Sequence, residues 1–115
     1  MAAVLGSGSV AAAVTRGAAP ASEARQQLAP VATAPGRDLY RVTYVGGEPA
    51  EVEINSRGSL SLVLLVFDDN RRLICRSAEA GPVQRCVWHP SATAPFWIEV
   101  RNPAGQDVPY QIETN

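Results

Sequence analysis

The chain has 115 residues, of which 46% are apolar and 18% charged, and its formal net charge is −1 at pH 7. This length favours one compact domain over a multidomain protein. No run of 18 apolar residues is present, which argues against a membrane-spanning helix. Ten arginines balanced by eleven acidic residues indicate no nucleic-acid partner.

Composition divides the chain near residue 37. The first 36 residues hold 12 of the 18 alanines, whereas all seven aromatic residues follow them. Residues 2–14 carry no charge, and Ala11 and Ala13 are small residues at the spacing that signal peptidase requires. We therefore expect a signal-peptide-like leader, cleaved or disordered, and a secreted or periplasmic protein. A plain flexible leader and a misplaced start codon are the alternatives.

Residues 15–37 contain three prolines and no face that could be buried, which predicts a flexible linker. The predicted units are therefore a leader and linker over residues 1–36 and a folded domain over residues 37–115.

An alternation of apolar and polar residues with a period of two begins after residue 37. Tyr40, Val42 and Tyr44, for example, alternate with Arg41 and Thr43. The predicted strands, about seven, are residues 40–44, 51–55, 60–67, 72–77, 84–89, 96–101 and 110–113. Because residues such as Gly, Pro and Asn separate them, we predict an all-β antiparallel sandwich, with a small open barrel as the alternative.

Residues 39–114 contain motifs that resemble those of a known family. The motifs are YRVTY at 40–44 before GGE at 46–48, LLVFDDN at 64–70 before LI at 73–74, and FWIEVRN at 96–102 before YQI at 110–112. Together they resemble the bacterial pre-peptidase C-terminal (PPC) domain. The resemblance implies a jelly-roll-like sandwich of the kind appended to secreted peptidases, with a role as an accessory or binding module.

Cys75 and Cys86 are the only cysteines. An even number of cysteines in a small exported domain predicts a disulfide rather than a metal site. If the bridge joins directly opposed residues of a hairpin, Leu73 lies opposite Trp88. Leu73, Trp88 and the two cysteines would then share one face that packs on the core.

The same hypothetical register places Arg76 opposite Arg85 and Arg72 opposite His89 on the other face of the hairpin. Like charges directly opposite each other are unfavourable unless something compensates them. One hypothesis is that this patch binds an acidic ligand or partner. The alternative, which we favour, is that nearby acidic side chains balance the patch and the face is merely solvated.

Asp68, Asp69 and Asn70 form an oxygen-rich run between two predicted strands. Such oxygens are the ligands that calcium prefers, although no EF-hand spacing follows them. The favoured alternative is a polar hairpin turn in which these side chains bond their own backbone. The sequence predicts no other metal or cofactor.

Trp97 is out of phase with Phe96, Ile98 and Val100, so we expect it to face away from the core formed by those residues, or into a second layer. An outward indole is a platform for a sugar or a peptide. The alternative is that the ring only covers neighbouring side chains.

No pattern in the sequence predicts catalysis. His89 is the only histidine and precedes Pro90, and no serine lies in a nucleophile motif. We therefore predict an exported, non-catalytic module that binds a protein or a polysaccharide in the cell envelope or outside it. The alternative is a structural or chaperone-like partner of a separately encoded secreted peptidase.

Overall fold

A computed structural model describes residues 26–58, 61–104 and 107–115. These ranges contain nine strands, and no helix in them is long and apolar enough to cross a membrane. The leader-like residues 2–14 lie outside the described ranges. The strands are β1 (Gln26–Gln27), β2 (Ala32–Ala34), β3 (Arg37–Tyr44), β4 (Ala50–Asn55), β5 (Val63–Asp68), β6 (Leu73–Ser77), β7 (Val83–Trp88), β8 (Ala94–Arg101) and β9 (Gln111–Thr114).

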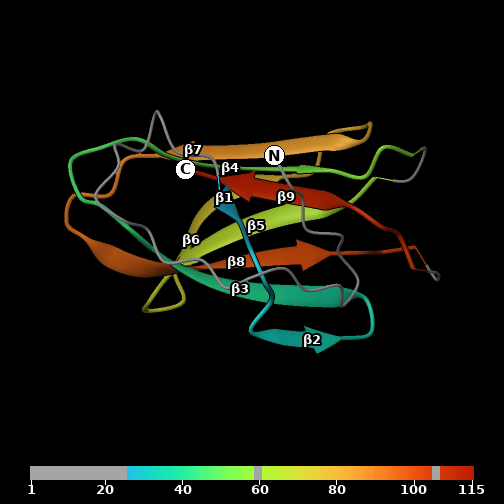
Figure 1. Ribbon diagram of the computed structural model, residues 1–115, viewed down its shortest axis with the longest axis horizontal. Helices are drawn as coiled ribbons and strands as arrows, with labels where there is room; N and C mark the ends of the chain where they lie inside the picture. Colours follow the sequence, from blue (N-terminus) through green and yellow to red (C-terminus); the bar gives the residue numbers. More distant parts are fainter. Residues whose placement is uncertain (1–25, 59–60, 105–106) are drawn as a thin grey trace.

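The strands form two antiparallel sheets that pack face to face (Figure 1). One sheet has four strands in the order β1-β9-β4-β7, and the other has five in the order β2-β3-β8-β5-β6. In Figure 1, β4, β7 and β9 of the four-stranded sheet lie in the upper part, and β2, β3 and β8 of the five-stranded sheet lie in the lower part. The predicted all-β antiparallel sandwich is confirmed, and β3 to β9 correspond to the seven predicted strands.

The folded domain begins earlier than the sequence predicts. β1 and β2 lie inside the predicted linker, and β2 pairs with β3 across a turn that contains Gly36 at a φ of 79°. Leu28, between β1 and β2, is only 1% exposed and belongs to the core. The linker prediction is therefore wrong for residues 26–36. Among the side chains of residues 28–36 that the structure describes, only Leu28 is buried, and one buried residue leaves no periodic signal in the sequence.

The core lies between the sheets and is built from alternate residues of each strand. β3 contributes Tyr40, Val42 and Tyr44, each at most 2% exposed. The ring centroids of Tyr44 and Trp88 lie 4.9 Å apart, and those of Trp88 and Phe96 lie 5.5 Å apart. Since Trp88 comes from one sheet and Tyr44 and Phe96 from the other, the cluster holds the layers together.

Three polar side chains form a buried hydrogen-bonded chain. The Tyr110 hydroxyl donates to Asp38 Oδ2 at 2.5 Å, and the Tyr40 and Tyr110 hydroxyl oxygens are also 2.5 Å apart. Burial raises the pKa of both Tyr110 and Tyr40, so the phenols remain neutral. A neutral phenol thus donates to the Asp38 carboxylate, whose burial without a donor would be costly.

The disulfide between Cys75 and Cys86 is present, with Cα atoms 6.0 Å apart. The hypothetical hairpin between their strands is wrong, because β6 pairs with β5 and β7 pairs with β4. β6 and β7 are edge strands of opposite sheets, so the bridge joins the two layers along one side of the sandwich. The physical reason is that residues 78–82 carry the chain from one layer to the other instead of closing a hairpin.

The predicted core face of that hairpin is correct only in part. Cys86 and Trp88 are buried, at 1% and 8% exposed, whereas Leu73 is 48% exposed. A break in the register of β5 with β6 places Leu73 opposite Phe67, although Cys75 lies opposite Val66. Such a bulge turns the start of β6 outward, which takes Leu73 away from the core.

Candidate functional site

The predicted arginine patch is divided between the two outer faces of the sandwich. Arg76 lies between the inward-facing Cys75 and Ser77 on β6, so it projects from the five-stranded sheet. Arg85 projects from β7 in the four-stranded sheet. Arg72 and His89 are exposed next to the two strands. Arg76 and Arg85 therefore do not face each other.

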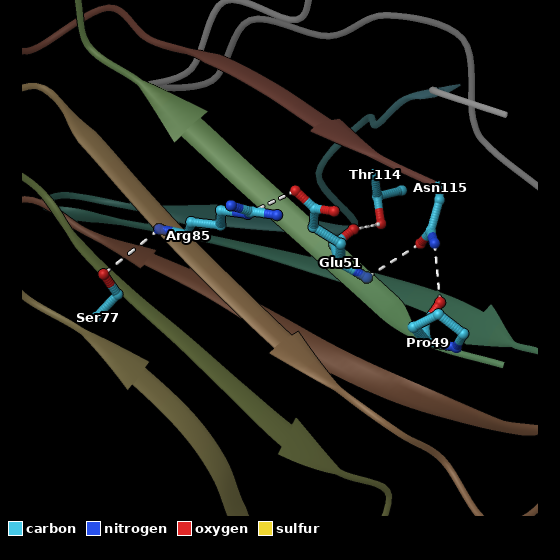
Figure 2. A network of polar contacts seen from close by, with 6 residues as sticks. All are labelled: Pro49, Glu51, Ser77, Arg85, Thr114 and Asn115. Atoms are coloured by element: carbon cyan, nitrogen blue, oxygen red, sulfur yellow. Dashed lines mark hydrogen bonds and ion pairs between the residues drawn. The ribbon is translucent and has the colours of Figure 1, made fainter. Parts of the chain in front are cut away.

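Arg85 is engaged by its own sheet. Its Nε donates to Glu51 Oε2 at 2.6 Å, and this hydrogen bond raises the pKa of Arg85. In Figure 2 the guanidinium points to the Glu51 carboxylate, while the Glu51 backbone bonds to Thr114 and Asn115. The Arg85 backbone N donates to Ser77 Oγ at 3.4 Å, which partly covers the free edge of β7. The contacts of Arg85 are those of a surface network rather than of a free cation.

Asp68, Asp69 and Asn70 lie in the turn between β5 and β6. Asp68 Oδ1 accepts hydrogen bonds from the backbone N of Asn70 and of Arg72, each at 2.9 Å. In the described part of the chain, no three His, Cys, Asp or Glu side chains are grouped so as to hold a metal. These contacts belong to a polar turn that bonds its own backbone. Calcium binding at these residues stays a hypothesis.

Trp97 projects outward from the five-stranded sheet, because Phe96 and Ile98 on either side of it are buried. Strand pairing places Arg41 of β3 directly opposite it on one side and Phe67 of β5 on the other. We call the outward side chains of β3, β5, β6 and β8 the Trp97 face.

Two charged residues hold Trp97 in place. The Arg41 guanidinium carbon lies 5.5 Å from the centroid of the Trp97 ring, which is within cation–π range. Trp97 Nε1 donates to Asp69 Oδ1 at 3.3 Å, and the same oxygen lies 3.7 Å from Arg41 Nη2. An indole that is already ordered loses little conformational entropy when a ligand contacts it.

Beside Trp97 the face contains a groove of about 470 Å³. We call it the Trp97 groove, and its lining consists of Arg37, Leu39, Phe67, Arg71, Trp97 and Glu99. Glu99 is only 5% exposed, and its Oε2 accepts a hydrogen bond from Arg101 Nε at 2.8 Å and forms an ion pair with Arg101 Nη2 at 2.8 Å. Because the positive charge of Arg101 compensates the Glu99 carboxylate, the two arginines of the lining, Arg37 and Arg71, dominate the charge of the groove.

The two outer faces differ in charge. The strands of the Trp97 face carry one outward acidic residue, Glu99, and several outward arginines. These arginines are Arg37, Arg41, Arg76 and Arg101. On β4, β7 and β9 of the opposite sheet, the outward charged residues are Glu51, Glu53, Arg85 and Glu113. The Trp97 face is the basic one, which favours a negatively charged partner.

Sequence reasoning found Trp97 but missed the groove beside it. Leu39 alternates with the buried Tyr40, so the period of two already places it outward, on the side that Trp97 shares. Phe67 ends the predicted strand over residues 60–67, in which nearly all residues are apolar, so no alternation marks it as a residue that lines a groove. Arg71 lies at the end of the turn between β5 and β6 and itself has a φ of 65°, and no periodic signal covers such a position.

No protein-family model and no curated protein matches the sequence. A solved structure with a similar fold is the pre-peptidase C-terminal domain of a collagenase from Bacillus anthracis, with a TM-score of 0.61 and 7% sequence identity. The match covers 70% of this chain and 77% of that one. At this identity the similarity concerns the fold alone, and at that level the resemblance to the PPC domain is confirmed.

Proposed function

We propose that this protein is an exported, non-catalytic accessory module that binds a negatively charged protein or polysaccharide through the Trp97 face. The observation that carries the proposal is the Trp97 groove, in which an apolar and aromatic floor is flanked by Arg37 and Arg71. Binding sites are commonly concave and mostly apolar, with a few polar groups that set specificity.

Two observations support a role without catalysis. Among the residues that the structure describes, the lining of the Trp97 groove has no histidine, cysteine or serine, and its carboxylate, Glu99, is bonded to Arg101. A nucleophile needs a neighbouring base, and the side chains of this groove supply no such pair. The solved structure of similar fold is a pre-peptidase C-terminal domain of a collagenase, which supports an accessory role.

Export is supported by the bridge between Cys75 and Cys86, since disulfides persist mainly in oxidising compartments. The test is the intact mass of the natively expressed protein under non-reducing conditions. We expect a mass that lacks the leader and two hydrogens. A full-length, reduced mass would overturn the proposal of export.

Binding is tested on two immobilised polyanions, poly-L-glutamate and polygalacturonate. We expect at least one of them to retain the wild-type protein, and Trp97→Ala and the double variant Arg37→Gln/Arg71→Gln to elute at lower salt. The matched control is Arg85→Gln, which removes an arginine from the opposite outer face and should elute like the wild type. If neither column retains the wild type, or if all variants elute together with it, the proposed binding face is wrong.

The collagenase origin of the similar structure also favours a second function, that of a structural or chaperone-like partner of a separately encoded secreted peptidase. This function predicts a peptidase gene beside the gene of this protein. Co-expression of the two should then raise the recovered peptidase activity. Unchanged activity would exclude this function.

A further inference from the structure

We infer that the partner of the Trp97 face is an acidic polysaccharide, that is, a chain of sugar rings that carry carboxylates. The inference rests on the proposed function, and it names the chemical class that the same groove would recognise.

The backbone of β8 and β5, the central strands on either side of which the other strands of this face lie, is not available to a peptide. β8 pairs with β3 and β5, and β5 pairs with β8 and β6, so both central strands have a partner on each side. Peptides that bind to sheets gain much of their affinity from main-chain hydrogen bonds to a free edge. A ligand that lies over β8 therefore meets side chains only, which suits ring stacking and ion pairing.

The apolar part of the groove suits a flat ring. Trp97 and Phe67 are directly opposed residues on adjacent strands, and Leu39 adds an aliphatic surface to the same groove. Aromatic side chains contribute large apolar areas with few rotatable bonds. A sugar presents the C–H groups on one side of its ring to such a surface, while its hydroxyls and carboxylate remain at the rim.

The cationic part of the groove suits carboxylates. Arg37 and Arg71 are exposed, and neither makes an ion pair within the described part of the chain. The guanidinium group can pair with a carboxylate through two parallel hydrogen bonds. By contrast, Arg101 is bonded to Glu99, so the chain already neutralises it.

The spacing of the arginines calls for a chain rather than a single sugar. Arg37 and Arg41 are four residues apart on β3, which corresponds to roughly 13 Å along the strand. Arg71 follows β5, so it approaches the groove from the other side of β8. Arg41 is already paired with Asp69 and lies directly opposite Trp97, so the distance between Arg37 and Arg41 also separates Arg37 from Trp97 along the sheet. A ligand that pairs with Arg37 and Arg71 and also covers Trp97 must therefore be longer than one ring. The acidic opposite face would repel a polyanion and direct it to the Trp97 face.

The test compares three polymers by titration calorimetry with the full chain. Polygalacturonate supplies rings and carboxylates, methyl-esterified polygalacturonate supplies rings without charge, and poly-L-glutamate supplies charge without rings. We expect polygalacturonate to bind at least tenfold more tightly than either of the others. We also expect Trp97→Ala to weaken that binding about tenfold, Trp97→Phe to restore most of it, and Arg37→Gln/Arg71→Gln to reduce its salt dependence.

Several results would overturn the inference. Tighter, Trp97-dependent binding of poly-L-glutamate would refute the polysaccharide and leave the proposed function intact. Equal binding of the esterified polymer would refute the requirement for charge. If neither polyanion binds, or if no groove variant changes binding, both the inference and the proposed binding face fail. Thermal unfolding of each variant checks its fold, and the exposed Arg37 and Arg71 provide a test that does not depend on Trp97→Ala being stable.

Discussion

The disulfide between Cys75 and Cys86 should contribute about 3 kcal/mol to the free energy of unfolding. The two cysteines are 11 residues apart in the sequence. In the chain-entropy model, closing a loop of about 12 residues stabilises the folded state by roughly 3 kcal/mol, because it restricts the unfolded chain. For a domain of this size, 1 kcal/mol corresponds to roughly 4–8 °C in the unfolding temperature, so the double variant Cys75→Ala/Cys86→Ala should unfold about 12–24 °C lower.

The assay is thermal and urea unfolding of the wild type and the double variant, each with and without a reducing agent. Reduction should lower the stability of the wild type to nearly that of the variant and leave the variant unchanged. A wild-type unfolding temperature that does not respond to reduction would refute the reasoning, since it would show that the bridge is absent or contributes nothing.

The position of the bridge leads to a local expectation as well. Because it joins the edge strands β6 and β7 of opposite sheets, its removal should loosen these two strands before the central ones. Amide hydrogen exchange in the double variant should therefore rise most in β6 and β7. A uniform rise that includes β8 would contradict the cross-sheet role.

Three further predictions concern the buried tyrosines, a glycine and the β5–β6 turn. Because burial raises the pKa of Tyr40 and Tyr110, their stabilising contribution should be complete below pH 10, the ordinary pKa of tyrosine, and decline at higher pH. Urea unfolding between pH 8 and 11 should show this decline, and the decline should flatten in Tyr40→Phe/Tyr110→Phe; a flat wild-type profile would contradict it. Gly46→Ala should lower the free energy of unfolding by roughly 1–3 kcal/mol, because the added Cβ would lie 2.5 Å from backbone atoms of the facing loop. Gly58→Ala is the control and should leave the free energy of unfolding nearly unchanged, because its added Cβ would have its nearest contact at 3.7 Å. Asp68→Ala should lower the free energy of unfolding by about 1–2 kcal/mol, because two hydrogen bonds are lost, and the loss should be the same in calcium and in a chelator. A loss of stability seen only with calcium would instead support the calcium site.

The local alternation of side chains predicted one residue of the candidate site. Trp97 is out of phase with Phe96 and Ile98, and the structure places it outward as that phase requires. The same rule applies to Leu39, although one isolated leucine gave no reason to single it out. Arg71 was beyond this kind of reasoning, because its position depends on the conformation of a turn.

The wrong expectation for Arg76 and Arg85 has a different cause. Cys75 and Cys86 do bond, but proximity of two sulfur atoms does not require that their strands pair. In a sandwich, two residues that face the interior from opposite layers come equally close. Which arrangement forms depends on the strand with which each cysteine-bearing strand pairs. Here β6 pairs with β5, and β7 pairs with β4.

The sequence by itself determined β3 to β9, the buried side of most of these strands, and which cysteines are available to bond. These properties follow from the period of two and from composition, both of which act locally. Only the tertiary structure decided which strands are neighbours, that Leu28 ties residues 26–36 to the core, and that Arg37, Trp97 and Arg71 border one groove. Those outcomes depend on pairing between strands that are distant in the sequence. Several strands with a similar local pattern could pair with any given strand, and the burial of the whole core selects one arrangement.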